Sequence, residues 1–137
     1  MCVQHFLKFV SESDAQVEVL PWGPHHWFSR PELTDARQLL VVRVTMPGGK
    51  AHAFHRHPCM EEVLYYLEGR AEQWVGKERR VVEAGEAVFV PQDEVHGTYN
   101  IFDEPVVFLA ILGPARFEGP ALIDVSADEP WRSIRGK

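Results

Sequence analysis

The stretch GGKAHAFHRHPCMEEVLYYLEG, from Gly48 to Gly69, decides the fold. It places His55 and His57 two residues apart and follows them with the adjacent carboxylates Glu61 and Glu62. On a β-strand, side chains two apart leave the same face, whereas on a helix they lie about 200° apart. The pair therefore predicts a strand that presents two imidazoles on one face.

The residues after this pair predict a turn and a second strand. Pro58–Glu61 is short enough to turn the chain back, and Glu62, Leu64 and Tyr66 then share one face of the next strand. A carboxylate at the start of that strand can meet the two imidazoles inside a sheet or barrel. Strand parity favours Glu62 for this place and leaves Glu61 as its rival, a carboxylate of the loop.

A second segment, GEAVFVPQDEVHGTYN (Gly85–Asn100), repeats this order of features. A short apolar strand stops at Pro91, an acidic loop follows, and the next strand opens with His96. If His96 points inward, a third imidazole joins the first two. The alternative is a surface patch, because histidine and glutamate are often exposed.

The rest of the chain predicts an all-β domain. Ten glycines and ten prolines interrupt the 137 residues, and the segments between them are short and rich in Val, Leu, Phe and Tyr. Their spacing is typical of a sandwich or barrel. Segments 31–40 and 129–134 are each expected to form a helical turn, and segment 21–31 has too much proline for regular structure. The expected strands are 39–46, 51–57, 62–67, 71–75, 79–83, 87–90, 96–102 and 106–112.

The two segments resemble the paired motifs of the cupin superfamily. The first motif is matched by Gly49, His55, His57, Glu62 and Gly69, and the second by Gly85, Pro91, His96 and Asn100. Asp93 stands where the second motif has glycine, and because Asp tolerates turn conformations we expect an altered loop with the site kept.

This resemblance covers about residues 39–112. It implies an antiparallel double-stranded β-helix, the jelly-roll or cupin barrel, with few short helical turns. We expect one domain over residues 1–137, with segments 1–38 and 113–137 packing on the barrel.

By the same resemblance, His55, His57, Glu62 and His96 bind one divalent transition metal. Three imidazoles and one carboxylate suit Fe, Mn, Ni, Co, Cu or Zn, and four protein ligands leave coordination positions open for catalysis. The resemblance implies a metal-dependent enzyme acting on a small molecule, as a dioxygenase, isomerase, cyclase or lyase. The alternative is a non-catalytic barrel that binds or senses a small molecule.

Further residues near these motifs carry hypotheses of their own. Tyr66, on the same face as Glu62, is the candidate catalytic side chain, as a general acid or to orient substrate; the alternative is a core tyrosine. His52 has the opposite parity to His55 and is expected to face away unless a bulge intervenes. Cys59 is expected to be a packed or exposed thiol in a loop at the barrel mouth. The aromatic segment Trp22–Phe28 is expected to cap the barrel or to join a dimer interface.

Composition narrows the partners. The formal net charge is −6, which argues against nucleic acid and anionic membranes as partners. The N-terminus lacks the pattern of a signal peptide, and apolar runs stay well below the ~18 residues of a membrane span. Two cysteines are too few for a disulfide framework, so we expect a cytoplasmic protein with reduced thiols. Exposed sheet edges and the N-terminal aromatics favour a homodimer.

Overall fold

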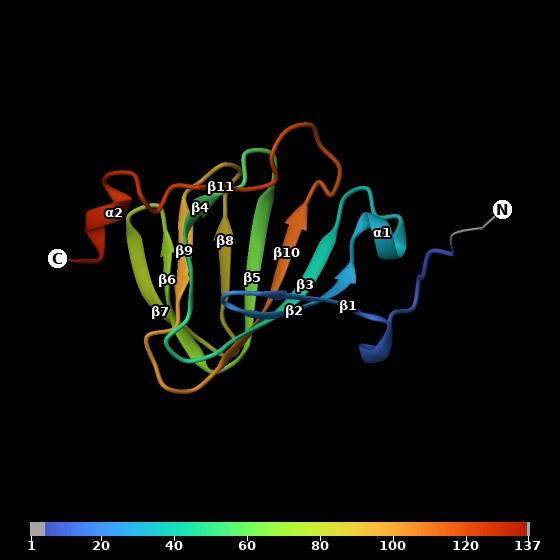
Figure 1. Cartoon of the computed structure of the whole chain (residues 1–137), viewed down its shortest axis with the longest axis horizontal. Coiled ribbons are helices and arrows are strands. Elements are labelled where there is room, and N and C mark those ends of the chain that lie inside the picture. The colour runs from blue at the N-terminus through green and yellow to red at the C-terminus, as the bar shows by residue number, and fades with distance from the viewer. Residues whose placement is uncertain (1–4, 137) are drawn as a thin grey trace.

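The computed structural model describes residues 5–136, which form two antiparallel β-sheets (Figure 1). The six-stranded sheet has the order β1-β2-β3-β10-β5-β8, and the five-stranded sheet has the order β11-β4-β9-β6-β7. Together they make the double-stranded β-helix that the sequence predicts. The strands are β1 (Gln16–Leu20), β2 (Gly23–Ser29), β3 (Leu40–Met46), β4 (Ala51–Arg56), β5 (Glu61–Glu68), β6 (Arg70–Val75), β7 (Glu78–Glu83), β8 (Ala87–Val90), β9 (His96–Tyr99), β10 (Val106–Gly113) and β11 (Ile123–Asp124).

Helical structure is confined to three short pieces of the described chain. These are a 3₁₀ turn, η1 (Glu12–Asp14), and the α-helices α1 (Pro31–Thr34) and α2 (Trp131–Ile134). The last two confirm the expected helical turns at 31–40 and 129–134, although each helix is shorter than its segment. With four residues apiece, neither α-helix approaches the ~20 residues needed to cross a bilayer.

All eight expected strands are present, but the prediction for segment 21–31 is wrong. Residues Gly23–Ser29 form β2, which pairs with both β1 and β3. The prolines are compatible with this strand because none lies in its middle: Pro21 is in the β1–β2 turn, Pro24 is the second residue of β2, and Pro31 starts α1. Proline content alone was therefore a poor guide to this segment, because its prolines stand near the ends of regular elements.

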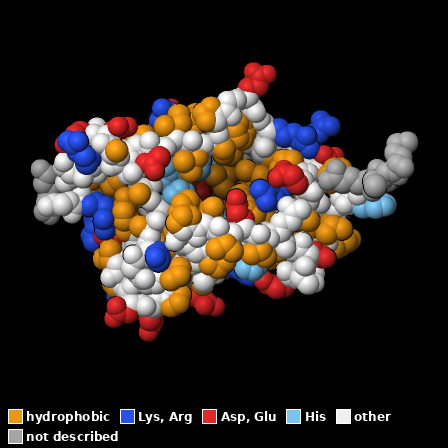
Figure 2. All heavy atoms as spheres, viewed as in Figure 1, with side chains coloured by type: hydrophobic (Ala, Val, Ile, Leu, Met, Phe, Trp, Pro, Cys, Tyr) orange, Lys and Arg blue, Asp and Glu red, His pale blue; other side chains and the backbone are white. Residues whose placement is uncertain are grey.

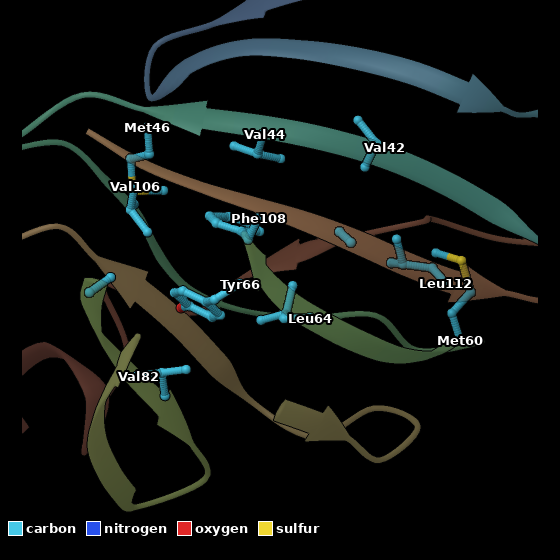
Figure 3. Close-up of a cluster of buried hydrophobic side chains, with 12 residues drawn as sticks. Val42, Val44, Met46, Met60, Leu64, Tyr66, Val82, Val106, Phe108 and Leu112 are labelled. Carbon is cyan, nitrogen blue, oxygen red and sulfur yellow. The ribbon is translucent and has the colours of Figure 1, made fainter. Parts of the chain in front are cut away.

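The main core lies in the barrel interior along β3, β10 and β5 (Figure 3). Alternate residues of β10 point inward, among them Phe108 and Leu112, and Leu64 and Tyr66 of β5 face the same interior. Tyr66 is fully buried and its ring stacks on Phe108. Leu64, Phe108 and Leu112 of this core also line the cavity beside the candidate site, so the core holds in place the strands that carry that site.

The outer face of the five-stranded sheet is covered by the C-terminal segment. Phe54 and Trp74 point to this face and pack with Trp131 and Ile134 of α2. Beyond the helix, the Arg135 guanidinium donates to both carboxylate oxygens of buried Glu72. Figure 1 shows α2 at the end of the molecule beside β6 and β7, far from the N-terminal hairpin β1–β2.

Candidate metal centre

Three histidines on or directly after strands of the five-stranded sheet meet inside the barrel. His55 of β4 lies directly opposite His96 of β9 in the sheet register, and His57 follows one residue after β4. One ring nitrogen from each lies within 4.8 Å of the other two. All three side chains are buried. The His-x-His spacing thus places both imidazoles on the face that His96 shares.

The backbone orients each of these rings in the same way. The Nδ1 atom of His55 lies 2.7 Å from the carbonyl oxygen of Ala53. The Nδ1 atom of His57 lies 2.9 Å from the carbonyl oxygen of Ala121, and that of His96 lies 3.0 Å from the carbonyl oxygen of Glu94. A carbonyl oxygen only accepts, so each Nδ1 carries the hydrogen. In the neutral rings every Nε2 then presents a bare lone pair, which is the form that binds a metal.

Glu62 completes the cluster from the opposite sheet. It lies at the start of β5 and is 6% exposed, with Oε1 2.9 Å from His96 Nε2 and 3.4 Å from His57 Nε2. Yet Glu62 Oε1 and His57 Nε2 are buried atoms without a hydrogen-bond partner among the described residues. Acceptor atoms that face one another this closely repel unless a cation lies between them. The donor set therefore fits a divalent transition metal.

The electrostatics of the cluster favour bound positive charge. Burial raises the pKa of Glu62, but the adjacent His57 and His96 rings outweigh burial and bring the pKa down to about 2. Burial lowers the pKa of His57, yet the Glu62 carboxylate more than compensates and leaves that pKa raised. Burial holds the pKa of His55 well below its usual value. A carboxylate ionised at neutral pH thus faces imidazoles that supply lone pairs.

The cluster lies at one side of an apolar cavity of about 260 Å³. Figure 2 shows the hollow on this face of the molecule, with hydrophobic side chains around it and histidine within it. Its wall is mostly aliphatic and aromatic, and the described lining contains neither lysine nor arginine. The apolar lining comprises Leu20, Trp22, Trp27, Leu40, Val42, Val44, Met60, Leu64, Phe108, Ala110, Leu112, Ala121 and Leu122.

Comparison with known families agrees with this architecture. The family Cupin_2, described as the cupin domain, matches residues 42–112, more than half of the chain. The chain belongs to the cupin family. The match starts within β3 and ends within β10, so it leaves out the hairpin β1–β2 and the C-terminal segment.

Two curated relatives and one solved structure illustrate the likeness. The chain is 30% identical over 84 residues to the uncharacterized protein MJ1618 of Methanocaldococcus jannaschii, covering 61% of this chain and 67% of that protein. It is 35% identical over 104 residues to the oxalate decarboxylase OxdC of Bacillus subtilis, covering 72% of this chain but only 26% of that protein. The polyketide cyclase RemF of Streptomyces resistomycificus superposes with a TM-score of 0.72 at 21% identity, over 96% and 94% of the two chains, which shows a shared fold.

The departure from the cupin motif at Asp93 leaves the loop intact. Asp93 adopts a φ of +64°, the left-handed conformation that glycine would supply. Its N–H donates to the His57 carbonyl oxygen and its carboxylate accepts from Arg56 at 2.7 Å. The motif Asn100 serves a turn, because its amide donates to the carbonyl oxygens of Met46 and Glu104. Both loop residues therefore act on backbone geometry.

The expectation that His52 faces away from the site is wrong. The pairing of β4 with β9 shifts register between His52 and His55, and this irregularity turns both side chains into the cavity. The His52 ring stacks on His55 at 3.6 Å between centroids and on Trp22 at 4.1 Å. His52 is not among the three described histidines whose nitrogens cluster.

The other candidate residues, Tyr66, Glu61 and Cys59, differ in how deeply they are buried. The Tyr66 hydroxyl donates to Gln73 Oε1 at 2.8 Å, and the described lining of the cavity does not include Tyr66. Glu61 is exposed on the opposite face of β5 from Glu62. Cys59 is half-buried, with Sγ 3.5 Å from the Glu118 carbonyl oxygen.

The segment Trp22–Phe28 caps the barrel. His25 and Trp27, two apart on β2, line the cavity, and so does Trp22 in the turn before the strand. Sequence reasoning did not find His25 or the carbonyl of Ala121 as parts of the site. Strand alternation through β2 could have indicated His25, but a backbone acceptor carries no side-chain signal.

Proposed function

We propose that this cupin is a metal-dependent enzyme that acts on a small, largely apolar molecule. The observation that carries the proposal is the convergence of His55, His57, His96 and Glu62 on one point beside an apolar cavity. These four would hold one divalent cation of Fe, Mn, Ni, Co, Cu or Zn. The cation would supply Lewis-acid or redox chemistry at a substrate oxygen, as open coordination positions allow.

The cavity wall supports a substrate of low charge. A dianion such as oxalate would need more positive charge than the one proposed cation to offset its desolvation, and the described lining supplies neither lysine nor arginine. The volume of about 260 Å³ lies just below the range of roughly 300–1,000 Å³ common for ligand pockets. We therefore propose a compact one- or two-ring molecule that presents a phenol, enol or carbonyl oxygen to the cation.

The chain's own residues would position this molecule and exclude water. Trp22 and Trp27 would cover the ring, and Thr98 offers the cavity an acceptor oxygen because its hydroxyl donates to Gln73 at 2.6 Å. For Tyr66 we propose a positioning role, since its hydroxyl holds the same Gln73 oxygen from the far side. The burial that raises the pKa of Tyr66 keeps the phenol protonated, as this hydrogen bond requires.

The decisive experiment couples metal analysis with turnover. The purified protein is analysed for metals, and oxygen uptake and product formation are followed with catechols, enols and flavonols as probes. Metal-dependent oxygen uptake would assign an oxygenase, and metal-dependent conversion without uptake an isomerase, cyclase or lyase. Tight binding of these probes without any conversion would favour the alternative function, a non-catalytic binding module. Protein that purifies without metal and takes up none would contradict the proposal.

We also propose a homodimer formed through the outer face of the six-stranded sheet. Tyr65 and Leu67 of β5 and Phe89 of β8 expose 40%, 39% and 53% of their surface there. The corresponding face of the other sheet is covered by α2 within the same chain. A second copy would bury the uncovered apolar side chains. Light scattering should give the mass of a dimer for the wild type and of a monomer for Phe89→Glu; a monomeric wild type would contradict this.

A further inference from the structure

His52 is the one polar side chain of the cavity, outside the metal cluster, whose hydrogen-bonding groups are not already used by described neighbours. His25 is occupied at both nitrogens: Nδ1 lies 2.9 Å from the Gly23 carbonyl oxygen and Nε2 accepts from Trp22 Nε1 at 3.1 Å. The Thr98 hydroxyl donates its proton to Gln73 Oε1. The structure gives His52 ring contacts but no hydrogen bond, and its nitrogens are not among the buried unpartnered atoms.

The position of the His52 ring leaves only its edge available. Trp22 covers one face, with the two rings 12° from parallel, and His55 covers the other at 10°. Trp22 is itself held by its hydrogen bond to His25. A neutral imidazole edge offers one N–H donor and one nitrogen acceptor. Two flat neighbours therefore fix an otherwise unused donor and acceptor in an apolar wall.

We infer that His52 is a specificity-determining residue that hydrogen-bonds a second polar group of the substrate. The inference rests on the proposed function, in which one substrate oxygen lies at the metal ligands. Because His52 stacks directly on the ligand His55, the second group must be close to the first. The fitting class is a ring with two neighbouring oxygens, such as a peri-dihydroxy or hydroxy-carbonyl aromatic. Held between Trp22 and His55, the edge of the His52 ring would orient the substrate ring by hydrogen-bonding its second oxygen.

The test compares two probes on zinc-loaded protein, because zinc prevents redox turnover. Affinities for 1,8-dihydroxynaphthalene and 1-naphthol are measured by calorimetry. We expect the wild type to prefer the diol by about tenfold, the worth of one good hydrogen bond. His52→Phe keeps a flat ring between Trp22 and His55 but removes the nitrogens, so the preference should fall to near unity with little change for 1-naphthol. His26→Phe makes the same exchange on β2 at a residue that does not line the cavity, and should keep the preference.

Each other outcome counts against the inference in a distinct way. A preference that survives in His52→Phe, or that disappears in Thr98→Val instead, would overturn it. Loss of zinc from His52→Phe would also overturn it, because His52 would then act by supporting His55. Failure of the wild type to bind either probe would overturn the proposed function itself. Binding of 1-naphthol without any preference for the diol would leave the proposed function standing and sink only the role of His52.

Discussion

The adjacent carboxylates Glu61 and Glu62 provide a matched pair of substitutions. Glu62→Gln removes one negative charge from a buried side chain whose Oε1 is 2.9 Å from His96 Nε2, and it preserves the shape. Glu61→Gln makes the same chemical change one residue earlier, on the exposed face of the same strand. The pair therefore separates a ligand from a mere acidic neighbour.

The expected loss of zinc affinity in Glu62→Gln is estimated by dividing the free energy of zinc binding equally among four ligands. Zinc sites with four protein ligands are worth about 10–16 kcal/mol, or about 2.5–4 kcal/mol per ligand. At about 1.4 kcal/mol per tenfold, losing the Glu62 carboxylate should weaken zinc binding by about 10²–10³-fold. Glu61→Gln should change zinc affinity by no more than about twofold, because exposed charges are screened.

The assay is a zinc titration in competition with a chromogenic chelator, with folding of both variants checked by circular dichroism. A Glu62→Gln protein that keeps zinc affinity within about threefold of wild type would refute the ligand assignment. An equal loss in Glu61→Gln would refute the parity argument that separates the two residues. Zinc content by mass spectrometry provides an independent count of bound ions.

Three further predictions concern residues around the cluster. The raised pKa of His57 means that a proton competes with zinc for Nε2. Zinc affinity should therefore rise by up to tenfold per pH unit until the pH exceeds that pKa. A zinc affinity that stays constant from about pH 6 to 8 would contradict this. Arg135→Ala should lower the free energy of unfolding by about 1–3 kcal/mol in urea, since it removes both hydrogen bonds to Glu72; an unchanged midpoint would contradict it. Asp93→Ala should cost about 1–2 kcal/mol in the same assay because of its positive φ, whereas Asp93→Gly should be nearly neutral, and equal costs would exclude backbone conformation as the cause.

The barrel strands and the histidine pair could be predicted from the sequence because both depend on local alternation. Parity along β4 and β5 places His55 and Glu62 on the interior faces, and the structure has them there. Parity failed at His52, where the register shift in the β4–β9 pairing breaks the alternation. Such a shift is decided by the partner strand, so the sequence of β4 alone does not show it.

The C-terminal contribution was hidden from sequence reasoning for a different reason. The Ala121 carbonyl oxygen accepts from His57 Nδ1 across more than sixty residues, and its position depends on how the segment after β10 folds back. That segment is held at its far end by α2 and by Arg135 on Glu72. A backbone acceptor has no residue-type signature, so only the fold could reveal it.

The residues of the metal cluster and some of the residues that close the cavity lie in different parts of this chain. The four metal-cluster residues lie within 42–112, whereas Trp22, Trp27 and Leu122, which close the apolar cavity, lie outside it. In the proposed function, the barrel would hold the cation, and the flanking segments would add to the substrate contacts that barrel residues such as His52 make. Trp27→Ala should therefore weaken 1-naphthol binding by about two- to tenfold, the usual worth of an aromatic contact, and leave zinc affinity unchanged. Equal losses of naphthol and zinc would show that the hairpin β1–β2 supports the metal cluster as well, and the proposed separation would be wrong.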